Sequence, residues 1–250
     1  MSSSAVPTIP QAPAGAALTV AGDQSVQGQT LEDLRQAVRY RRWLASFATP
    51  WLGPRPLEVG SGLGDYAAEW APWVQVFTAS EGDVQRLELL RARFAGDPRV
   101  RVRALLAPIT ENADHSAVVA YNVLEHIADD VEALRGFARL LASGGRVILV
   151  VPAFTFAMSR FDREIGHFRR YRRPDLVAAL DAAGLRLVCL HYVNAPGLLA
   201  WTVGMRILRM RPAAGPALSV WDRLVPAFAA VERWVPPPFG QSVFAVARRP

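Results

Sequence analysis

The sequence predicts an α/β protein with a Rossmann-like, mostly parallel sheet of seven strands and helices on both of its faces. Two observations lead to this fold class. Short apolar runs rich in β-branched residues alternate with helix-like stretches, which is typical of a parallel sheet covered on both sides. In addition, 51% of the 250 residues are hydrophobic and 20% are charged, as in an ordinary globular protein.

The chain before the first strand divides into a tail and a helix. Residues 1–24 are rich in Ser, Ala, Pro and Gly and lack the positive segment of a secretory signal, so a disordered tail is expected there. Thr30 is a predicted N-cap, and the apolar spacing after it indicates one amphipathic helix of about 18 residues that ends before Pro50.

Strands and helices then follow in alternation. Strands are predicted at Pro56–Val59, Val74–Ala79, Val100–Leu105, Ala117–Tyr121, Arg146–Val151, Leu185–His191 and, last, Ser242–Ala247. Helices are predicted between most of them, at Asp65–Trp70, Val84–Phe94, Asp130–Leu141 and Pro174–Ala183. We therefore expect a single domain over residues 25–250.

A long helical insertion is expected over residues 192–240, before the last strand. It contains apolar helical patterns at Gly197–Met210 and Ala217–Trp234, and a connection of this length requires a purpose. Its five arginines stand against two carboxylates, a net charge of +3. The insertion is first interpreted as an apolar cap over an acceptor pocket. Interfacial contact with a membrane and a plain packed helix pair are the alternatives.

Charge and cysteine content exclude several classes of protein. The net charge is +6, and all 28 basic residues are arginine, a bias that a GC-rich coding sequence explains without phosphate contacts. Cys189 is the only cysteine, so the chain has no internal disulfide and no cysteine-rich zinc site. No uncharged apolar run reaches the roughly 18 residues of a membrane span. A cytoplasmic protein is expected.

The turn after the first strand carries the strongest functional signal. In Leu57-Glu-Val-Gly-Ser-Gly-Leu-Gly-Asp65, glycines at alternate positions allow a tight turn and a close approach to a ligand. The spacing GxGxG differs from the GxGxxG that supports a pyrophosphate. The acidic Glu58 instead favours a cofactor that carries an ammonium group. The alternative is a turn that merely joins a strand to a helix.

This turn resembles motif I of the class I S-adenosylmethionine-dependent methyltransferases. The resemblance implies that Gly60, Ser61, Gly62 and Gly64 lie against the methionine part of S-adenosylmethionine and that Glu58 acts on its amino group. S-adenosylhomocysteine would be the product. Glu81 matches the acid that binds the ribose hydroxyls in this family. Leu106 stands near the usual adenine-binding Asp, so adenine would rest on backbone and apolar groups.

Two later segments extend the resemblance. Asn122-Val-Leu-Glu-His126 matches the family motif NxLEH, found beside the reactive methyl group, which implies a cofactor contact at Asn122. Residues 162–171 resemble the segment DxxxGHxRRY of a bacterial subgroup. In relatives a helix before the glycine turn closes over the methionine, and Tyr40 is expected to face the cofactor from there.

His126 and His167 are the candidate catalytic bases, because both follow strand ends and imidazole titrates near neutral pH. Asn122, Glu125, His126 and His167 are an alternative metal set, weakened because some relatives have a carboxylate in place of Asn122. Arg169, Arg170, Arg172 and Arg173 around Tyr171 are a candidate clamp for an anionic acceptor; the alternative is a solvated loop neutralised by Asp162 and Glu164.

The predicted function is methyl transfer to the oxygen, nitrogen or carbon of a small molecule with an apolar or aromatic body. Methyl transfer to a lipid-linked or polyprenol-linked acceptor at a membrane is the alternative. A nucleic-acid modifier is disfavoured, because the chain lacks the (N/D)PP(Y/F) motif and an appended basic module. A non-catalytic cofactor-binding protein is a further alternative.

Overall fold

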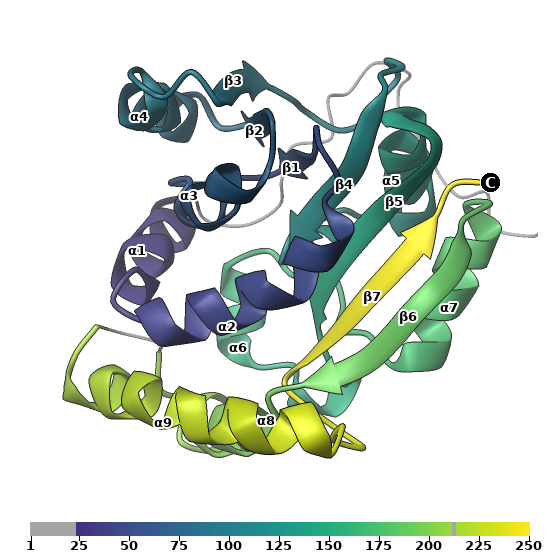
Figure 1. Ribbon diagram of the computed structural model, residues 1–250. Helices are drawn as coiled ribbons and strands as arrows, with labels where there is room; N and C mark the ends of the chain where they lie inside the picture. The colour runs from purple at the N-terminus through teal and green to yellow at the C-terminus, as the bar shows by residue number, and fades with distance from the viewer. Residues whose placement is uncertain (1–23, 212–213) are drawn as a thin grey trace, which may run out of the picture.

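The fold is a seven-stranded sheet with helices on both faces, as the sequence predicts. The computed structural model describes residues 24–211 and 214–250 (Figure 1). The strands are β1 Leu57–Val59, β2 Phe77–Glu81, β3 Val100–Ala104, β4 His115–Tyr121, β5 Leu141–Pro152, β6 Arg186–Val193 and β7 Ser242–Arg248. Their order is β3-β2-β1-β4-β5-β7-β6. All pairings from β3 to β5 are parallel, and β7 runs antiparallel to both β5 and β6.

Helices form the outer layers. They are α1 Gln24–Leu34, α2 Val38–Ala48, α3 Asp65–Trp70, α4 Val84–Phe94, α5 Asp130–Arg139, α6 Arg160–Glu164, α7 Arg173–Ala182, α8 Ala195–Trp201 and α9 Pro216–Trp234. On one face, α2, α3 and α4 bury Leu44, Trp70 and Phe94 against the sheet. On the other face, α5 and α7 bury Phe137 and Leu180.

The strand order determines which edge of the sheet can bind a ligand. β1 lies between β2 and β4, so the connections that follow β1 and β4 leave the sheet in opposite directions. Open α/β sheets bind ligands at such a switch point, outside the carboxyl ends of the strands. Glu58 pairs in register with Ala79 and Val119, so the turns after β1, β2 and β4 meet at this edge.

The single helix predicted after Thr30 is wrong. Two helices occupy this region, and Thr30 lies inside α1. The helical conformation is interrupted at residues 35–37, where Ala37 adopts a non-helical conformation (φ −81°, ψ 63°) and is buried. The break has a packing reason. α2 follows the sheet with Leu44, Ala45 and Ala48 inward, whereas Gln27 and Arg35 from the segment before it line the cavity at the sheet edge. The predicted tail, residues 1–24, lies outside the described residues except for Gln24.

Several other boundaries differ from the prediction; among them, β4 begins at His115 rather than Ala117, and β5 begins at Leu141 rather than Arg146. α5 ends at Arg139, and Leu141 already belongs to β5, where it pairs with His115. β2 begins at Phe77 rather than Val74, because a 3-10 turn over Ala71–Trp73 delays it. It extends to Glu81 because Glu81 pairs with Ala104.

The insertion before β7 is helical, as expected. α8 continues into a π-helical turn over Thr202–Ile207, and α9 follows. Two carboxylates of α9 hold it in place. Asp222 accepts a hydrogen bond from the backbone N–H of Tyr40 in the first turn of α2 (2.9 Å), and Glu232 accepts from Asn194 and Ala195 at the start of α8 (2.9 and 2.8 Å). Each caps amides that a helix start leaves unpaired.

No helix within the described part of the chain is both long enough and apolar enough to cross a membrane.

Candidate active site

The glycine turn after β1 adopts the left-handed conformations that its sequence requires. Gly60, Gly62 and Gly64 have φ angles of 69°, 55° and 79°. A Cβ atom on Gly60 would also lie 2.9 Å from Val123 Cγ2, across the turn that follows β4. Ser61 ties the turn to β2, since its N–H donates to Ser80 O at 2.7 Å and its hydroxyl accepts from Ser80 N at 3.1 Å. Glycine at position 60 is therefore required by both the backbone and the space around it.

A cavity of about 540 Å³ opens at this turn. Eight of the nine residues predicted to bind the cofactor line it, and so do both candidate histidines. The exception is Gly64, the residue before α3, where a Cβ would lie 2.6 Å from the Phe94 ring. The structure thus gives Gly64 a packing role between α3 and α4.

Glu58 is a buried carboxylate without a partner for one of its oxygens. Its residue is 2% exposed, and Oε2 makes no hydrogen bond. Burial raises the pKa of Glu58 to about 8; the Ser61 hydroxyl opposes this shift and the nearby Glu81 adds to it. A cationic group in the cavity would satisfy the free oxygen, which is what the ammonium of S-adenosylmethionine offers.

Glu81 is held in a fixed position at the end of β2. Its Oε2 accepts from Gly62 N at 2.8 Å, and its Oε1 accepts from Gly82 N and Asp83 N at 2.9 and 3.0 Å. The carboxylate thereby links the glycine turn to the β2 turn on the cavity wall. A carboxylate fixed in this position can accept hydrogen bonds from a pair of ribose hydroxyls. Glu58 and Glu81 together therefore fit the ammonium and the ribose of S-adenosylmethionine.

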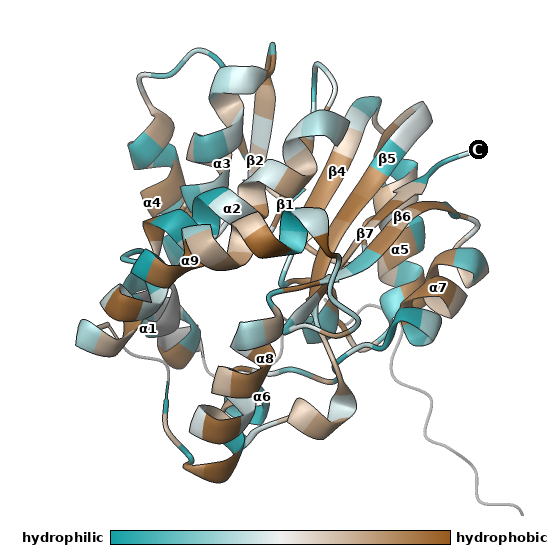
Figure 2. Cartoon of the chain, turned by 60° about the horizontal axis from the view of Figure 1, so that its bottom comes forward, coloured by the Kyte–Doolittle hydropathy of each residue, from teal (hydrophilic) through white to brown (hydrophobic). Residues whose placement is uncertain are grey.

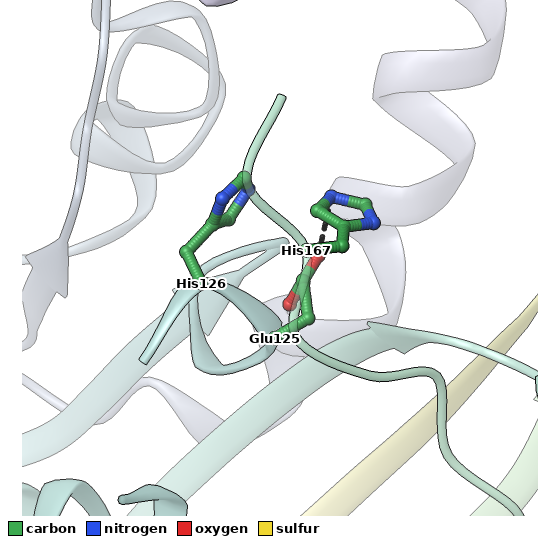
Figure 3. A group of neighbouring side chains, drawn as sticks. All are labelled: Glu125, His126 and His167. Atoms are coloured by element: carbon green, nitrogen blue, oxygen red, sulfur yellow. Dashed lines mark ion pairs between the residues drawn. The ribbon is translucent and has the colours of Figure 1, made fainter. Parts of the chain in front are cut away.

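Glu125, His126 and His167 form a cluster (Figure 3), in which the two histidines line the cavity and Glu125 is fully buried. The imidazole rings are T-shaped, with centroids 4.5 Å apart. His167 Nε2 lies 3.8 Å from Glu125 Oε1, and its Nδ1 lies 2.9 Å from Asp162 Oδ1. Glu125 and His126 come from the 3-10 turn after β4, and His167 from the loop after α6. The topology therefore joins two segments about 40 residues apart in sequence.

The cluster contains orphaned polar atoms. Both carboxylate oxygens of Glu125 and Nδ1 of His126 are buried without a hydrogen-bond partner in the described structure. Burial raises the pKa of Glu125 to about 7, against the opposing effect of His167. Burial, together with His167, lowers the pKa of His126 to about 3, so its imidazole is neutral near pH 7. Candidate ligand atoms of the three residues lie within 4.8 Å of one another, so the cluster could also hold a divalent cation.

Asp162 anchors this cluster. Its carboxylate accepts from the Ser159 hydroxyl, the Arg170 guanidinium and the His167 ring at 2.6, 2.7 and 2.9 Å. Burial alone would raise its pKa, but the hydrogen bonds from His167 and Arg170 hold it well below its usual range. Sequence reasoning had assigned Asp162 only to neutralising arginines. Its function in fixing His167 depends on a contact that no sequence spacing reveals.

The predicted arginine clamp is not assembled at the cavity. Of its four arginines only Arg170 lines the cavity, and its guanidinium is bound to Asp162. Arg169 pairs with Asp130 (2.7 Å), Arg172 with Asp175 (3.1 Å), and Arg173 lies over the Tyr192 ring. Glu164 neutralises none of them, because it pairs with Arg160 and Arg211.

Several aromatic residues that line the cavity are not among the predicted site residues. Tyr66 and Tyr121 pack edge to face, Phe137 and Phe161 also line the cavity, and Phe168 lies next to His167 in the chain. Trp201, within the predicted helical pattern Gly197–Met210, reaches the cavity from α8 and donates to Ala157 O at 3.2 Å. The insertion thus forms part of the wall.

Comparison with known proteins relates the chain to methyltransferases. Residues 57–147 match the family model described as a methyltransferase domain. Uncharacterized methyltransferases of Mycobacterium bovis and Mycobacterium tuberculosis are 24% identical over 196 residues, which cover 75% of this chain and 72% of theirs.

Solved structures share the fold at low sequence identity. Geranyl diphosphate C-methyltransferase of Streptomyces coelicolor, solved with Mg²⁺, geranyl diphosphate and S-adenosylhomocysteine, is 15% identical with a TM-score of 0.59, covering 83% of this chain and 77% of its own. The [4+2]-cyclase SpnF is 17% identical with a TM-score of 0.54, covering 84% and 81%. Because the fold also serves a cyclase, the family model and the mycobacterial relatives carry the assignment of activity.

We predict that cofactor binding depends on Glu81. S-adenosylhomocysteine should bind in the micromolar range or tighter and raise the melting temperature, whereas NAD should do neither. Glu81→Ala removes a charged acceptor and should weaken binding by about 1.5–3 kcal/mol in titration calorimetry. Glu88→Ala, on the exposed face of α4, is the matched control. Binding of NAD without S-adenosylhomocysteine would contradict the assignment.

Glu58 should make the stability of the ligand-free protein depend on pH. Its pKa rises from 4.5 in the unfolded chain to about 8 in the folded one, so between these values only the unfolded state is ionised. Ionisation of the unfolded chain therefore lowers the free energy of unfolding as the pH rises from 4.5 to about 8. The side-chain amide of the variant Glu58→Gln cannot ionise. The melting temperature of this variant should exceed that of wild type by roughly a few degrees at pH 8 and by less at pH 5. Equal differences at both pH values would refute the buried-carboxyl account.

Proposed function

We propose that the chain, an S-adenosylmethionine-dependent methyltransferase, acts on the hydroxyl oxygen of a small molecule with an apolar or aromatic body. The observation that carries the proposal is the pairing of His167, which lines the cavity, with the buried Asp162. A hydroxyl must lose its proton as it is methylated, and an imidazole oriented by a carboxylate is suited to accept it. A neutral amine has a free lone pair and needs no proton removed before it attacks the methyl group.

His167 is the proposed base. If Nδ1–H donates to Asp162, Nε2 carries the lone pair, and this tautomer is the one that can accept a proton. Glu125 Oε1, 3.8 Å from Nε2, would then face the imidazolium that forms. His126 lies edge-on to the same ring and stays neutral, so it does not compete for the proton.

Positioning supplies the rest of the catalysis. S-adenosylmethionine supplies the activated methyl group when bound. The glycine turn, Glu58 and Glu81 hold the donor, and the acceptor is held on the histidine side of the same cavity. Phe161, Phe168 and Trp201 line that side and favour an apolar body. Because Arg170 is already bound to Asp162, an anionic group on the acceptor is not part of the proposal.

His167→Ala should lower turnover by about 10²–10⁴-fold and leave the affinity for S-adenosylhomocysteine nearly unchanged. Asp162→Asn should lower turnover as well and alter the pH profile of kcat, because an amide that donates to Nδ1 selects the other tautomer. The assay follows radioactive methyl transfer from S-adenosylmethionine to a panel of phenols and aliphatic alcohols. His115→Ala is the control, since that ring lies half-buried at the start of β4, where its Nδ1 is 3.3 Å from Arg55 O, and does not line the cavity.

Thermal melting separates catalytic loss from unfolding, because Asp162 also caps α6. Full activity in His167→Ala on a methylated alcohol would contradict the proposed base. Methylation confined to amines would contradict the hydroxyl acceptor while leaving the methyltransferase assignment intact.

Metal removal distinguishes the base from a metal site at the same residues. Enzyme treated with EDTA and passed over a desalting column should retain its activity, because the proposed proton acceptor is His167 itself. Loss of activity that Mn²⁺ or Zn²⁺ restores would instead assign Glu125, His126 and His167 to a bound cation.

A further inference from the structure

The helix α9 has a second apolar face that nothing in the described structure covers. Val220, Leu224, Val231 and Trp234 are spaced so that they form one stripe along the helix, and Trp234 is 82% exposed. The opposite face is already used, since Val225 and Asp222 are buried there. The stripe is therefore additional to the amphipathic pattern that packs α9 onto α2.

A second exposed stripe follows α8 into the π-helical turn. Leu199, Val203 and Ile207 recur at every fourth position, and each has at least half of its surface exposed. Leu198 of the same helix is buried, and Trp201 points to the cavity. Figure 2 shows hydrophobic segments along α8 and α9 at the end of the molecule that is turned forward. Soluble monomers rarely leave several large apolar side chains exposed on consecutive helices.

The charges around these stripes are of one sign. Both carboxylates between residues 195 and 240, Asp222 and Glu232, point inward and bind backbone amides. Arg209, Arg223 and Arg233 have no carboxylate partner among residues 24–211 and 214–250. The outward surface of the insertion thus combines exposed apolar side chains with unpaired cations.

We propose that this surface, formed by α8, Thr202–Ile207 and α9, docks peripherally on an anionic lipid bilayer. Apolar side chains flanked by arginine, with tryptophan at the end, are the composition that binds in the plane of a bilayer interface. Anionic lipid headgroups complement Arg223 and Arg233, whereas a second copy of the chain on the same face would oppose like charges. The proposal is independent of the proposed acceptor, but it places the Trp201 wall of the cavity close to the bilayer.

Vesicle co-sedimentation tests the proposal on the full chain. Wild type should sediment with vesicles of phosphatidylcholine mixed with phosphatidylglycerol, bind phosphatidylcholine alone at least about tenfold more weakly, and dissociate as salt is raised. Leu224→Glu/Val231→Glu should abolish sedimentation. Arg223→Gln/Arg233→Gln should lower binding to the anionic vesicles by about tenfold and leave binding to neutral vesicles unchanged.

Matched controls keep the test specific. Leu89→Glu changes a leucine that is similarly exposed on α4 and should sediment like wild type. Unchanged melting temperature and S-adenosylhomocysteine affinity show that the α9 variants are folded. Absence of wild-type sedimentation, or equal sedimentation with neutral and anionic vesicles, would overturn the proposal. So would a dimer in light scattering that Leu224→Glu/Val231→Glu dissociates while vesicles fail to bind.

Discussion

Burial of carboxyl groups at one edge of the sheet is the constraint on which the site depends. Glu58, Glu81, Glu125 and Asp162 are all nearly inaccessible to water; Glu58 and Glu81 line the cavity, and Glu125 and Asp162 contact His167, which also lines it. A buried carboxylate is costly unless it is paired. Glu81 and Asp162 are satisfied by backbone amides and by Arg170, Ser159 and His167. Glu58 and Glu125 are not, and burial raises the pKa of both, so the folded chain leaves carboxyl groups that a cationic ligand group and a protonated imidazole would pair with.

The sequence predicted those parts of the structure that depend on neighbours in the chain. The glycine turn needs left-handed backbone at alternate positions, and apolar strands separated by helices lead to a parallel sheet, so the fold was predicted correctly. The break at residues 35–37 was missed because it serves the cavity rather than any local pattern. The early end of α5 was missed because Leu141 is as apolar as a helix residue, and only pairing with His115 makes it a strand residue.

The candidate site divides in the same way. Local sequence motifs were enough to predict a group of residues that do line the cavity: Glu58, Gly60, Ser61, Gly62 and Glu81. The four arginines around Tyr171 are adjacent in sequence, but in the structure each has a different partner. These partners are Asp130, Asp162, Asp175 and the Tyr192 ring. A charge run indicates where cations are, and only the fold determines what they bind. Asp162 shows the reverse case, since its partners His167 and Arg170 were visible in sequence while their meeting point was not.

The two inward carboxylates of α9 have a consequence for how this architecture can change over time. Asp222 completes the first turn of α2, which has no side-chain cap of its own, and Glu232 does the same for the amides at the start of α8. The insertion and α2 are therefore coupled, because a residue of the insertion caps the start of that helix. Exchange of the insertion for that of another lineage, whether by recombination or by a protein engineer, would uncap α2 beside Tyr40 at the cavity. The two segments should consequently be inherited, and grafted, as one unit.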